Sequence, residues 1–182
     1  MEDVREWNRT VGGQSFLVSN SRDLFPHEFA QRAFATTDMS WATSMPPEKM
    51  KTALENSCTV AVYKSHTNGS SDQTQHSPVG MARLSTDYVT FAYLTDVFIL
   101  EEYRKLGLGQ WLIQCCGDLV VDMPYLRWMM LLTGSEHAER MYERELGMQR
   151  LGIREDGLIS MGAKKVHLQA AGRGAHPQGT TD

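Results

Sequence analysis

The chain has 182 residues, enough for one domain of ordinary size with a proper core. Hydrophobic residues make up 41% and charged residues 22%, as in globular proteins, and a formal net charge of −4 offers no basic footprint for a nucleic acid. No apolar run approaches the ~20 residues that cross a bilayer, and the first residues have no secretory character. Three cysteines, two of them adjacent, lack the spacing of a disulfide framework or a zinc site. We therefore expect a cytoplasmic protein without metal, membrane or nucleic-acid partners.

The first half of the chain predicts an α/β arrangement after a polar lead-in at residues 1–13, which we expect to be loosely held. Ser21 or Asp23 is placed to cap the first helix. The polar stretch 65–77 has no apolar residue and predicts a long hairpin loop. Periodicity predicts, in order, a strand at 15–19, a helix with Pro26 in its first turn that breaks near residues 36–38, a helix from residues 46–47 to about Asn56, and strands at 57–63 and 79–84.

Residues 94–121 carry the most informative pattern. The apolar run 94–100 is interrupted only by Thr95 and Asp96 and predicts a buried central strand. The sequence Arg-Lys-Leu-Gly-Leu-Gly follows at 104–109, and from Gln110 a helical pattern places Leu112, Cys115 or Cys116, Leu119 and Met123 on one face. A strand, a glycine-bearing turn and a helix direct first-turn amides and the positive end of the helix dipole at an anion. We expect a phosphate-bearing ligand here; the alternative is a plain turn without one.

Two phosphate-binding motifs are excluded by the same residues. The GxxxxGK pattern of a Walker loop is absent, and Leu112 occupies the third position of a dinucleotide fingerprint. The Arg-x-x-Gly-x-Gly sequence instead resembles the pyrophosphate loop of the GNAT superfamily of acyl-CoA-dependent N-acyltransferases. The resemblance extends over residues 14–163: it includes the strand end Val-Phe-Ile, the Glu-Tyr-Arg lead-in, a second strand at 128–133, and Ala138-x-x-x-Tyr142 followed by Leu-Gly-Met at 146–148.

The rest of the chain completes one predicted domain at 14–168. Short strands are expected at 149–153 and 158–163, joined by a turn at Asp156-Gly157, and a disordered tail at 169–182. The resemblance implies a GNAT-like α/β (α+β) fold, whose central, mixed, mostly antiparallel sheet is flanked by helices. It implies that the fourth strand, ending near Leu100, and the fifth, at 128–133, splay apart.

The resemblance further implies acetyl-CoA as the cofactor. Its pantetheine arm would pair with the backbone of Val97, Phe98 and Ile99, as an added strand pairs with an open edge. Its diphosphate would lie on the loop formed by Arg104, Lys105, Leu106, Gly107, Leu108, Gly109 and Gln110.

Two residues are candidates for catalysis. By the resemblance, Tyr142 protonates the departing thiolate, although the helix after it carries one extra residue and ends in Met148 where the family has phenylalanine. Asp96 is a carboxylate in an apolar strand, so it needs either a partner or a functional role. It relays a proton from the amine, or it holds a neighbouring loop. Tyr93 stands where some relatives carry a glutamate base. His137 more simply caps the last helix.

The acceptor pocket is expected to be lined by Trp41, Asp87, Tyr88 and Tyr93, since aromatic rings with a carboxylate suit a cationic amine. The predicted function is transfer of an acetyl group to a primary amine of a small molecule or peptide, by a monomer or homodimer. The alternative is a CoA-binding or regulatory module of the same fold with weak catalysis.

Overall fold

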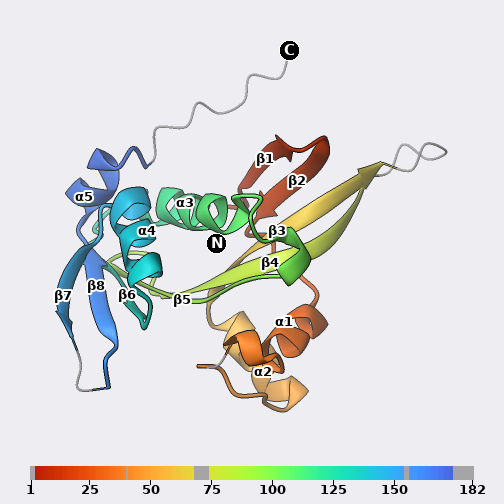
Figure 1. Ribbon diagram of the computed structural model, residues 1–182, viewed down its shortest axis with the longest axis horizontal. Helices are drawn as coiled ribbons and strands as arrows, with labels where there is room; N and C mark the ends of the chain where they lie inside the picture. Colours follow the sequence, from red (N-terminus) through yellow and green to blue (C-terminus); the bar gives the residue numbers. More distant parts are fainter. Residues whose placement is uncertain (1–2, 40, 68–73, 154–155, 174–182) are drawn as a thin grey trace. The chain divides into compact units, whose positions relative to one another are not determined.

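The computed structural model describes residues 3–39, 41–67, 74–153 and 156–173 (Figure 1). Its strands form an eight-stranded sheet in the order β1-β2-β3-β4-β5-β6-β8-β7. β5 and β6 pair in parallel, whereas β1–β2, β2–β3, β3–β4, β6–β8 and β7–β8 are antiparallel. Helices flank this mixed, mostly antiparallel sheet, which confirms the predicted fold class.

The element bounds agree with most of the predicted ranges. Among the described residues, no helix has both the length and the apolar character that crossing a bilayer requires. The strands are β1 (Glu6–Val11), β2 (Gln14–Ser19), β3 (Cys58–Thr67), β4 (Thr74–Thr86), β5 (Phe91–Ile99), β6 (Trp128–Thr133), β7 (Gln149–Ile153) and β8 (Ile159–Ala163). The helices are α1 (His27–Phe34), α2 (Pro47–Glu55), α3 (Leu108–Val121), α4 (Glu136–Leu146) and α5 (Lys165–Ala170), with short 3-10 helices η1 (Thr37–Met39) and η2 (Glu101–Tyr103).

The chain divides into two compact units. The first unit is Met1–Ser85 with Asp96–Leu112, and the second is Thr86–Thr95 with Ile113–Asp182. β5 and α3 each contribute residues to both units. The limits of a single domain at residues 14 and 168 remain a prediction.

β1 is an edge strand that the sequence analysis did not expect. Residues 6–11, assigned there to a loosely held lead-in, pair antiparallel with all of β2 across a Gly12-Gly13 turn in which both glycines have positive φ. Most of β1 is exposed, so it carries little of the apolar alternation by which a strand is recognised. Ladder hydrogen bonds and turn geometry, rather than burial, define this strand.

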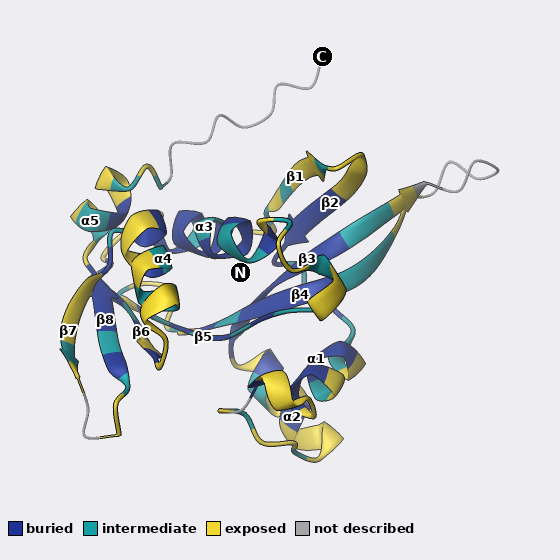
Figure 2. Ribbon diagram, in the orientation of Figure 1, coloured by how far each residue is buried: buried dark blue, intermediate teal, exposed yellow. Residues whose placement is uncertain are grey.

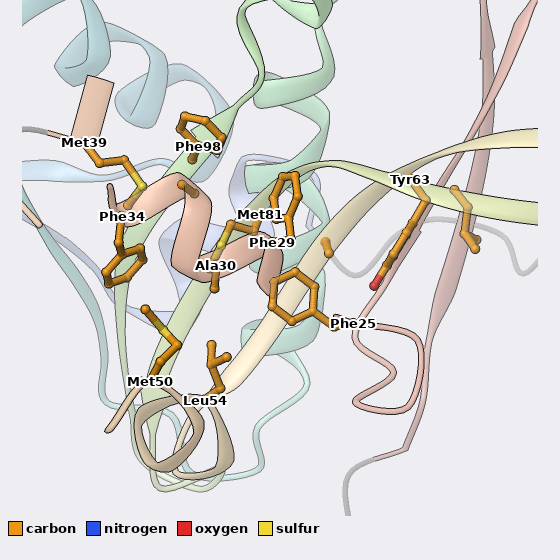
Figure 3. Packing of buried hydrophobic residues seen from close by; sticks show 13 residues of the cluster. Phe25, Phe29, Ala30, Phe34, Met39, Met50, Leu54, Tyr63, Met81 and Phe98 are labelled. Carbon is orange, nitrogen blue, oxygen red and sulfur yellow. The ribbon is translucent and has the colours of Figure 1, made fainter. Parts of the chain in front are cut away.

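The core of the first unit lies between α1, α2 and the strands behind them. Phe29, Ala33 and Phe34 lie on the buried face of α1, and Phe25, just before the helix, is buried with them. Figure 3 shows the three phenylalanine rings in one cluster with residues from α2, β3, β4 and β5. The predicted cap is wrong: Pro26 occupies the N-cap in an extended conformation, without a side-chain cap hydrogen bond, so neither Ser21 nor Asp23 has that role.

The hairpin formed by β3 and β4 is longer than the sequence predicts. Within the polar stretch 65–77, the cross-strand pairs include Ser65 with His76 and Thr67 with Thr74. Backbone pairing therefore continues where there is no apolar residue to bury, and only residues 68–73 of the predicted loop lie outside the described residues. The imidazole Nδ1 of His76 lies 3.0 Å from the Ser65 hydroxyl, which adds a half-buried polar contact between the two strands.

In the second unit, β6 and β7 both pair with β8, and α4 has one buried and one exposed face (Figure 2). α4 ends at Gly147, whose φ of +61° is the left-handed C-terminal cap that glycine favours. The Met148 amide donates to the Tyr142 carbonyl oxygen across this end. The extra residue relative to the family pattern is thus accommodated in a regular helix end that follows Tyr142.

The last described residues belong to the second unit. Residues 169–173, assigned by sequence to a disordered tail, form the end of α5 and a turn. Leu168 of α5 is fully buried, and the Arg173 guanidinium lies 3.9 Å from the buried Asp118 carboxylate of α3. Residues 174–182 of the predicted tail lie outside the described residues.

Candidate active site

The turn between β5 and α3 has the geometry predicted for an anion-binding loop. η2 ends at Tyr103, the turn covers residues 104–107, and α3 begins at Leu108, two residues earlier than the apolar pattern indicates. The amide of Trp111 makes the first intrahelical hydrogen bond, 3.0 Å to the carbonyl oxygen of Gly107. The amides of Leu108 and Gly109 precede that bond, so they point out of the positive end of the helix dipole.

The two glycines of the turn differ in their surroundings. Gly107 has a φ of +73°, and a Cβ built on it would meet no atom within 4 Å. Gly109 lies in the first helical turn, where a Cβ would make an ordinary 3.6 Å contact with Cγ1 of Ile99. The open space at Gly107 lets a ligand approach the backbone closely just before α3, as a phosphate-binding turn requires.

The Arg104 side chain holds the turn and links it to η1. Its Nε donates to the Ile99 carbonyl oxygen at 3.0 Å, and its Nη2 donates to Oδ2 of Asp38 at 2.7 Å. Both partners of the ion pair remain about two-fifths exposed. The sequence gives no sign of this pair, because Asp38 lies 66 residues before Arg104.

Two further cations lie against aromatic rings on either side of the turn. Arg9 of β1 lies 4.7 Å from the centre of the Trp111 ring, and Lys64 of β3 lies 5.8 Å from that of Tyr103. The Tyr103 ring also makes an edge contact with Phe16 of β2. The turn is therefore bordered by positive charge from strands distant in sequence. Arg9 was not identified from the sequence because strand β1 was not predicted.

Val97, Phe98 and Ile99 form the last part of β5. Phe98 enters the core of the first unit, whereas Val97 and Ile99 are half-buried. The Leu100 amide donates to the Val79 carbonyl oxygen at 2.9 Å. β4 approaches so closely that a Cβ on Gly80 would lie 2.3 Å from Cδ1 of Ile99, and 2.8 Å from the carbonyl oxygen of Phe98. This part of β5 is thus fixed against β4.

The parallel pairing of β5 with β6 is short. It joins Phe91 with Trp128, Ala92 with Met129 and Tyr93 with Met130. Among the described residues this register does not reach Val97–Ile99, which agrees with the predicted splay of these strands.

Asp96 lies just before that segment and has an unusual backbone. Its side chain is 6% exposed, and Nε of Arg83 on β4 donates to its Oδ2 at 2.7 Å. Its φ is +54°, in the left-handed region that residues other than glycine rarely adopt. The sequence analysis expected a partner or a functional role for this carboxylate, and the structure shows the partner.

Tyr142 lies on the buried face of α4 in the second unit. The N-cap of the helix is Ser135, whose hydroxyl accepts from the Ala138 amide, so the cap is not His137, which is exposed. Burial raises the pKa of the Tyr142 phenol to about 12, with a smaller upward contribution from the neighbouring Cys116 of α3. Tyr142 therefore keeps its proton throughout the physiological pH range, as a proton donor must.

The four candidate acceptor residues are divided between the units. Trp41 lies in the first unit, after η1, and is 60% exposed. Asp87, Tyr88 and Tyr93 lie in the second unit, the first two in the turn from β4 to β5 and Tyr93 on β5. Tyr88 is exposed and has a φ of +60°.

Asp87 organises the turn in which it lies. Its Oδ1 accepts from the amides of Val89, Thr90 and Phe91, and its Oδ2 accepts from the Thr90 hydroxyl. The hydrogen bond from the Thr90 hydroxyl, followed by those from the amides, lowers the pKa of the Asp87 carboxyl. This local role was not apparent from the sequence, although an Asp followed by a Thr three residues later is a turn-forming arrangement.

Comparison with known proteins agrees with this arrangement. The sequence model of the acetyltransferase (GNAT) family matches residues 25–148. A Gibberella zeae protein named as an acetyltransferase is 32% identical over 142 residues, which are 74% of this chain and 79% of that protein. A GNAT-family crystal structure from Xanthomonas campestris pv. campestris is 28% identical, with a TM-score of 0.53, and the match covers 69% of this chain and 80% of that one. Spermidine N-acetyltransferase from Vibrio cholerae, crystallised with CoA and spermine, shares the fold at 13% identity and a TM-score of 0.63, covering 91% of this chain and 98% of that one.

These matches include a family model that spans most of the chain and a relative above 30% identity. The chain belongs to the acetyltransferase (GNAT) family, whose chemistry is acyl transfer.

Proposed function

We propose that the protein is an N-acetyltransferase that transfers the acetyl group of acetyl-CoA to a primary amine of a small molecule or a peptide. The observation that carries the proposal is the turn at residues 104–107, in which Gly107, the residue before the start of α3, has open space where a Cβ would lie. The Vibrio cholerae neighbour, which binds CoA and is named for an amine substrate, supports the same interpretation at the level of the fold.

The residues present fit a diphosphate at this turn. The amides of Leu108 and Gly109 and the charges of Arg104 and Lys105 would bind it, with Leu106, Gly107 and Gln110 completing the loop. The backbone of Val97, Phe98 and Ile99 would pair with the amide-bearing arm. When bound, acetyl-CoA supplies an activated thioester.

The reaction has two proton steps: the amine gives up protons to water, and the departing sulfur takes one back, with Tyr142 beside it as the donor. An alkyl amine has an ordinary pKa near 10.4, so it must lose a proton before its nitrogen bonds to the acetyl carbon. The carbon–sulfur bond breaks, and we assign Tyr142 as the donor to the sulfur. Because an ordinary thiol has a pKa of about 8.5 and burial raises that of Tyr142 to about 12, the main contribution of the hydroxyl is a hydrogen bond to the developing thiolate.

The acceptor is assigned to three aromatic residues, of which Trp41 and Tyr88 are exposed and Tyr93 is half-buried. We propose that Trp41, Tyr88 and Tyr93 contact the amine substrate, since ring faces attract cations. Both carboxylate oxygens of Asp87 accept hydrogen bonds within the turn, so its contribution is to hold Tyr88 in its left-handed conformation. The cytoplasmic location and the monomeric or homodimeric state remain predictions.

Transfer is tested by incubating the protein with acetyl-CoA and a pooled library of primary amines, followed by mass spectrometry. We expect acetylated amines in amounts equal to the thiol released, and an acetyl group on nitrogen that resists hydroxylamine. Tight binding of acetyl-CoA with no acetylated amine would favour the CoA-binding module instead.

A further inference from the structure

We infer that Asp96 and Arg83 are positioning residues. Their ion pair holds the left-handed turn of β5 at Asp96, and this turn sets the course of Val97–Ile99. The inference rests on the proposed function, in which that segment pairs with the pantetheine arm, and it decides between the two roles open to Asp96.

The backbone at Asp96 is the first support. Three described residues other than glycine have positive φ, namely Tyr88, Asp96 and Lys105, and of these Asp96 alone lies within a strand. A left-handed residue interrupts the ladder of a strand and re-aims the residues that follow it, and such strain is kept where the surroundings determine it. Asparagine and aspartate tolerate this conformation better than other side chains with a Cβ.

The ion pair is the second support. Asp96 is 6% exposed and Arg83 is 22% exposed, so the carboxylate has lost most of its water and depends on protein partners such as Nε of Arg83. Arg83 itself is fixed on β4, where it pairs with Thr59 of β3. The planar guanidinium of Arg83 donates in a fixed direction, so it fixes the position of the Asp96 carboxylate. Because that carboxylate is bonded directly to the Cβ, the pair also restrains the backbone of Asp96.

The position of the turn is the third support. Pairing of β5 with β6 ends at Tyr93, and contact of β5 with Gly80 of β4 involves Phe98 and Ile99. Asp96 lies between these two fixed parts of the strand. A change of backbone at Asp96 would therefore alter the direction in which Val97–Ile99 presents its amides and carbonyl groups.

The test compares side chains at residue 96 by their tolerance of positive φ. Glycine adopts it without cost, asparagine tolerates it and can accept from Arg83, and β-branched valine resists it. Binding of acetyl-CoA is measured by calorimetry, with melting temperature and circular dichroism as checks of the fold. We expect Asp96→Asn and Asp96→Gly to bind within about threefold of wild type and to keep the shape of the pH–rate profile, and Asp96→Val to bind about tenfold or more weakly.

The control places the same side chain on the neighbouring residue. Thr95→Val is nearly isosteric and lies outside the positive-φ position, so acetyl-CoA affinity should not change. If Asp96 is a proton relay, Asn, Gly and Val variants will all bind like wild type and lose turnover by about 10²-fold or more, with the acidic limb of the profile removed. That result would overturn the inference.

A double variant keeps the inference falsifiable if Asp96→Val does not fold. Arg83→Met removes the guanidinium and keeps much of the aliphatic length, and we expect weaker acetyl-CoA binding by about tenfold. Adding Asp96→Gly should restore the affinity, because glycine needs no partner to hold the turn. A double variant as weak as Arg83→Met would contradict the inference alone, whereas wild type that fails to bind acetyl-CoA would contradict the proposed function as well.

Discussion

Replacing Gly107 by glutamate perturbs the proposed diphosphate site without displacing neighbouring atoms. The new side chain enters space in which a Cβ meets nothing within 4 Å, so steric overlap with the protein is not expected. Two effects remain. The φ of +73° is unfavourable for any residue with a Cβ, and a negative charge is added at the residue that precedes α3.

These effects have separable magnitudes. The backbone cost is about 1–2 kcal/mol and lowers the stability of the free protein as well as the complex. A carboxylate about 5 Å from a diphosphate charge costs about 1–3 kcal/mol at an effective dielectric constant of 20–80, and this cost falls on binding. At about 1.4 kcal/mol per decade, we expect acetyl-CoA affinity to fall by about 5- to 140-fold. Gly107→Ala carries the backbone cost without the charge and should bind several-fold more tightly than Gly107→Glu.

The assay is calorimetric titration with acetyl-CoA at low and high salt, since screening reduces the charge effect. Gly157→Glu is the matched control, because Gly157 also has a positive φ, +81°, with nothing within 4 Å of a built Cβ. The control should lose similar stability and bind acetyl-CoA like wild type. Equal affinity of Gly107→Glu and wild type would refute the placement of the diphosphate.

Three further predictions follow from side chains at and beyond the turn. Tyr142→Phe should bind acetyl-CoA normally and lose kcat by about 10²- to 10³-fold. Its unfolding free energy should also fall less between pH 10 and 12, because the wild-type phenol ionises near 10 when unfolded but at about 12 when folded, which is worth about 3 kcal/mol of stability lost as pH rises. Asp38→Asn should tighten acetyl-CoA binding about two- to fivefold, because it removes the charge that pairs with Arg104. Binding of acetyl-pantetheine, which lacks the diphosphate, should not change. An equal effect on both ligands would contradict a role of Arg104 at the diphosphate. Arg173→Met should lower the free energy of unfolding in urea by about 1–2 kcal/mol, because it removes a partner of the buried Asp118 carboxylate. A stop codon directly after Arg173 keeps the pair and should leave the free energy of unfolding unchanged. Equal urea midpoints for Arg173→Met and wild type would show that the pair is not stabilising.

The elements that could be predicted from the sequence are those marked by a pattern within one contiguous stretch of residues. β6 was expected at its observed bounds, because its six residues are apolar or β-branched and Gly134 follows them. The turn at 104–109 was recognisable because its glycines and the helix after it are contiguous. The start of α3 was placed two residues late, since the helix is buried around most of its circumference, including Trp111, Ile113 and Val120, and a one-face pattern does not mark its limits.

Pairings between distant residues could not be predicted in this way. Arg83 and Asp96 lie 13 residues apart, and Asp38 and Arg104 lie 66 apart, so no periodicity connects them. The charge of Asp96 in an apolar strand indicated a partner, but the register of β4 decides which one. The stacking of Arg9 on Trp111 depends on β1, an exposed strand held by its ladder, and was therefore missed with it.

The proposed cofactor site is tested most directly by hydrogen–deuterium exchange of the wild-type protein with acetyl-CoA and, separately, with acetyl-pantetheine at saturating concentrations. We predict that acetyl-CoA slows amide exchange in peptides covering residues 97–99 and 104–110. Acetyl-pantetheine should slow only the first segment, because it carries the arm without the diphosphate. Saturation by acetyl-CoA with unchanged exchange at 104–110 would contradict the account.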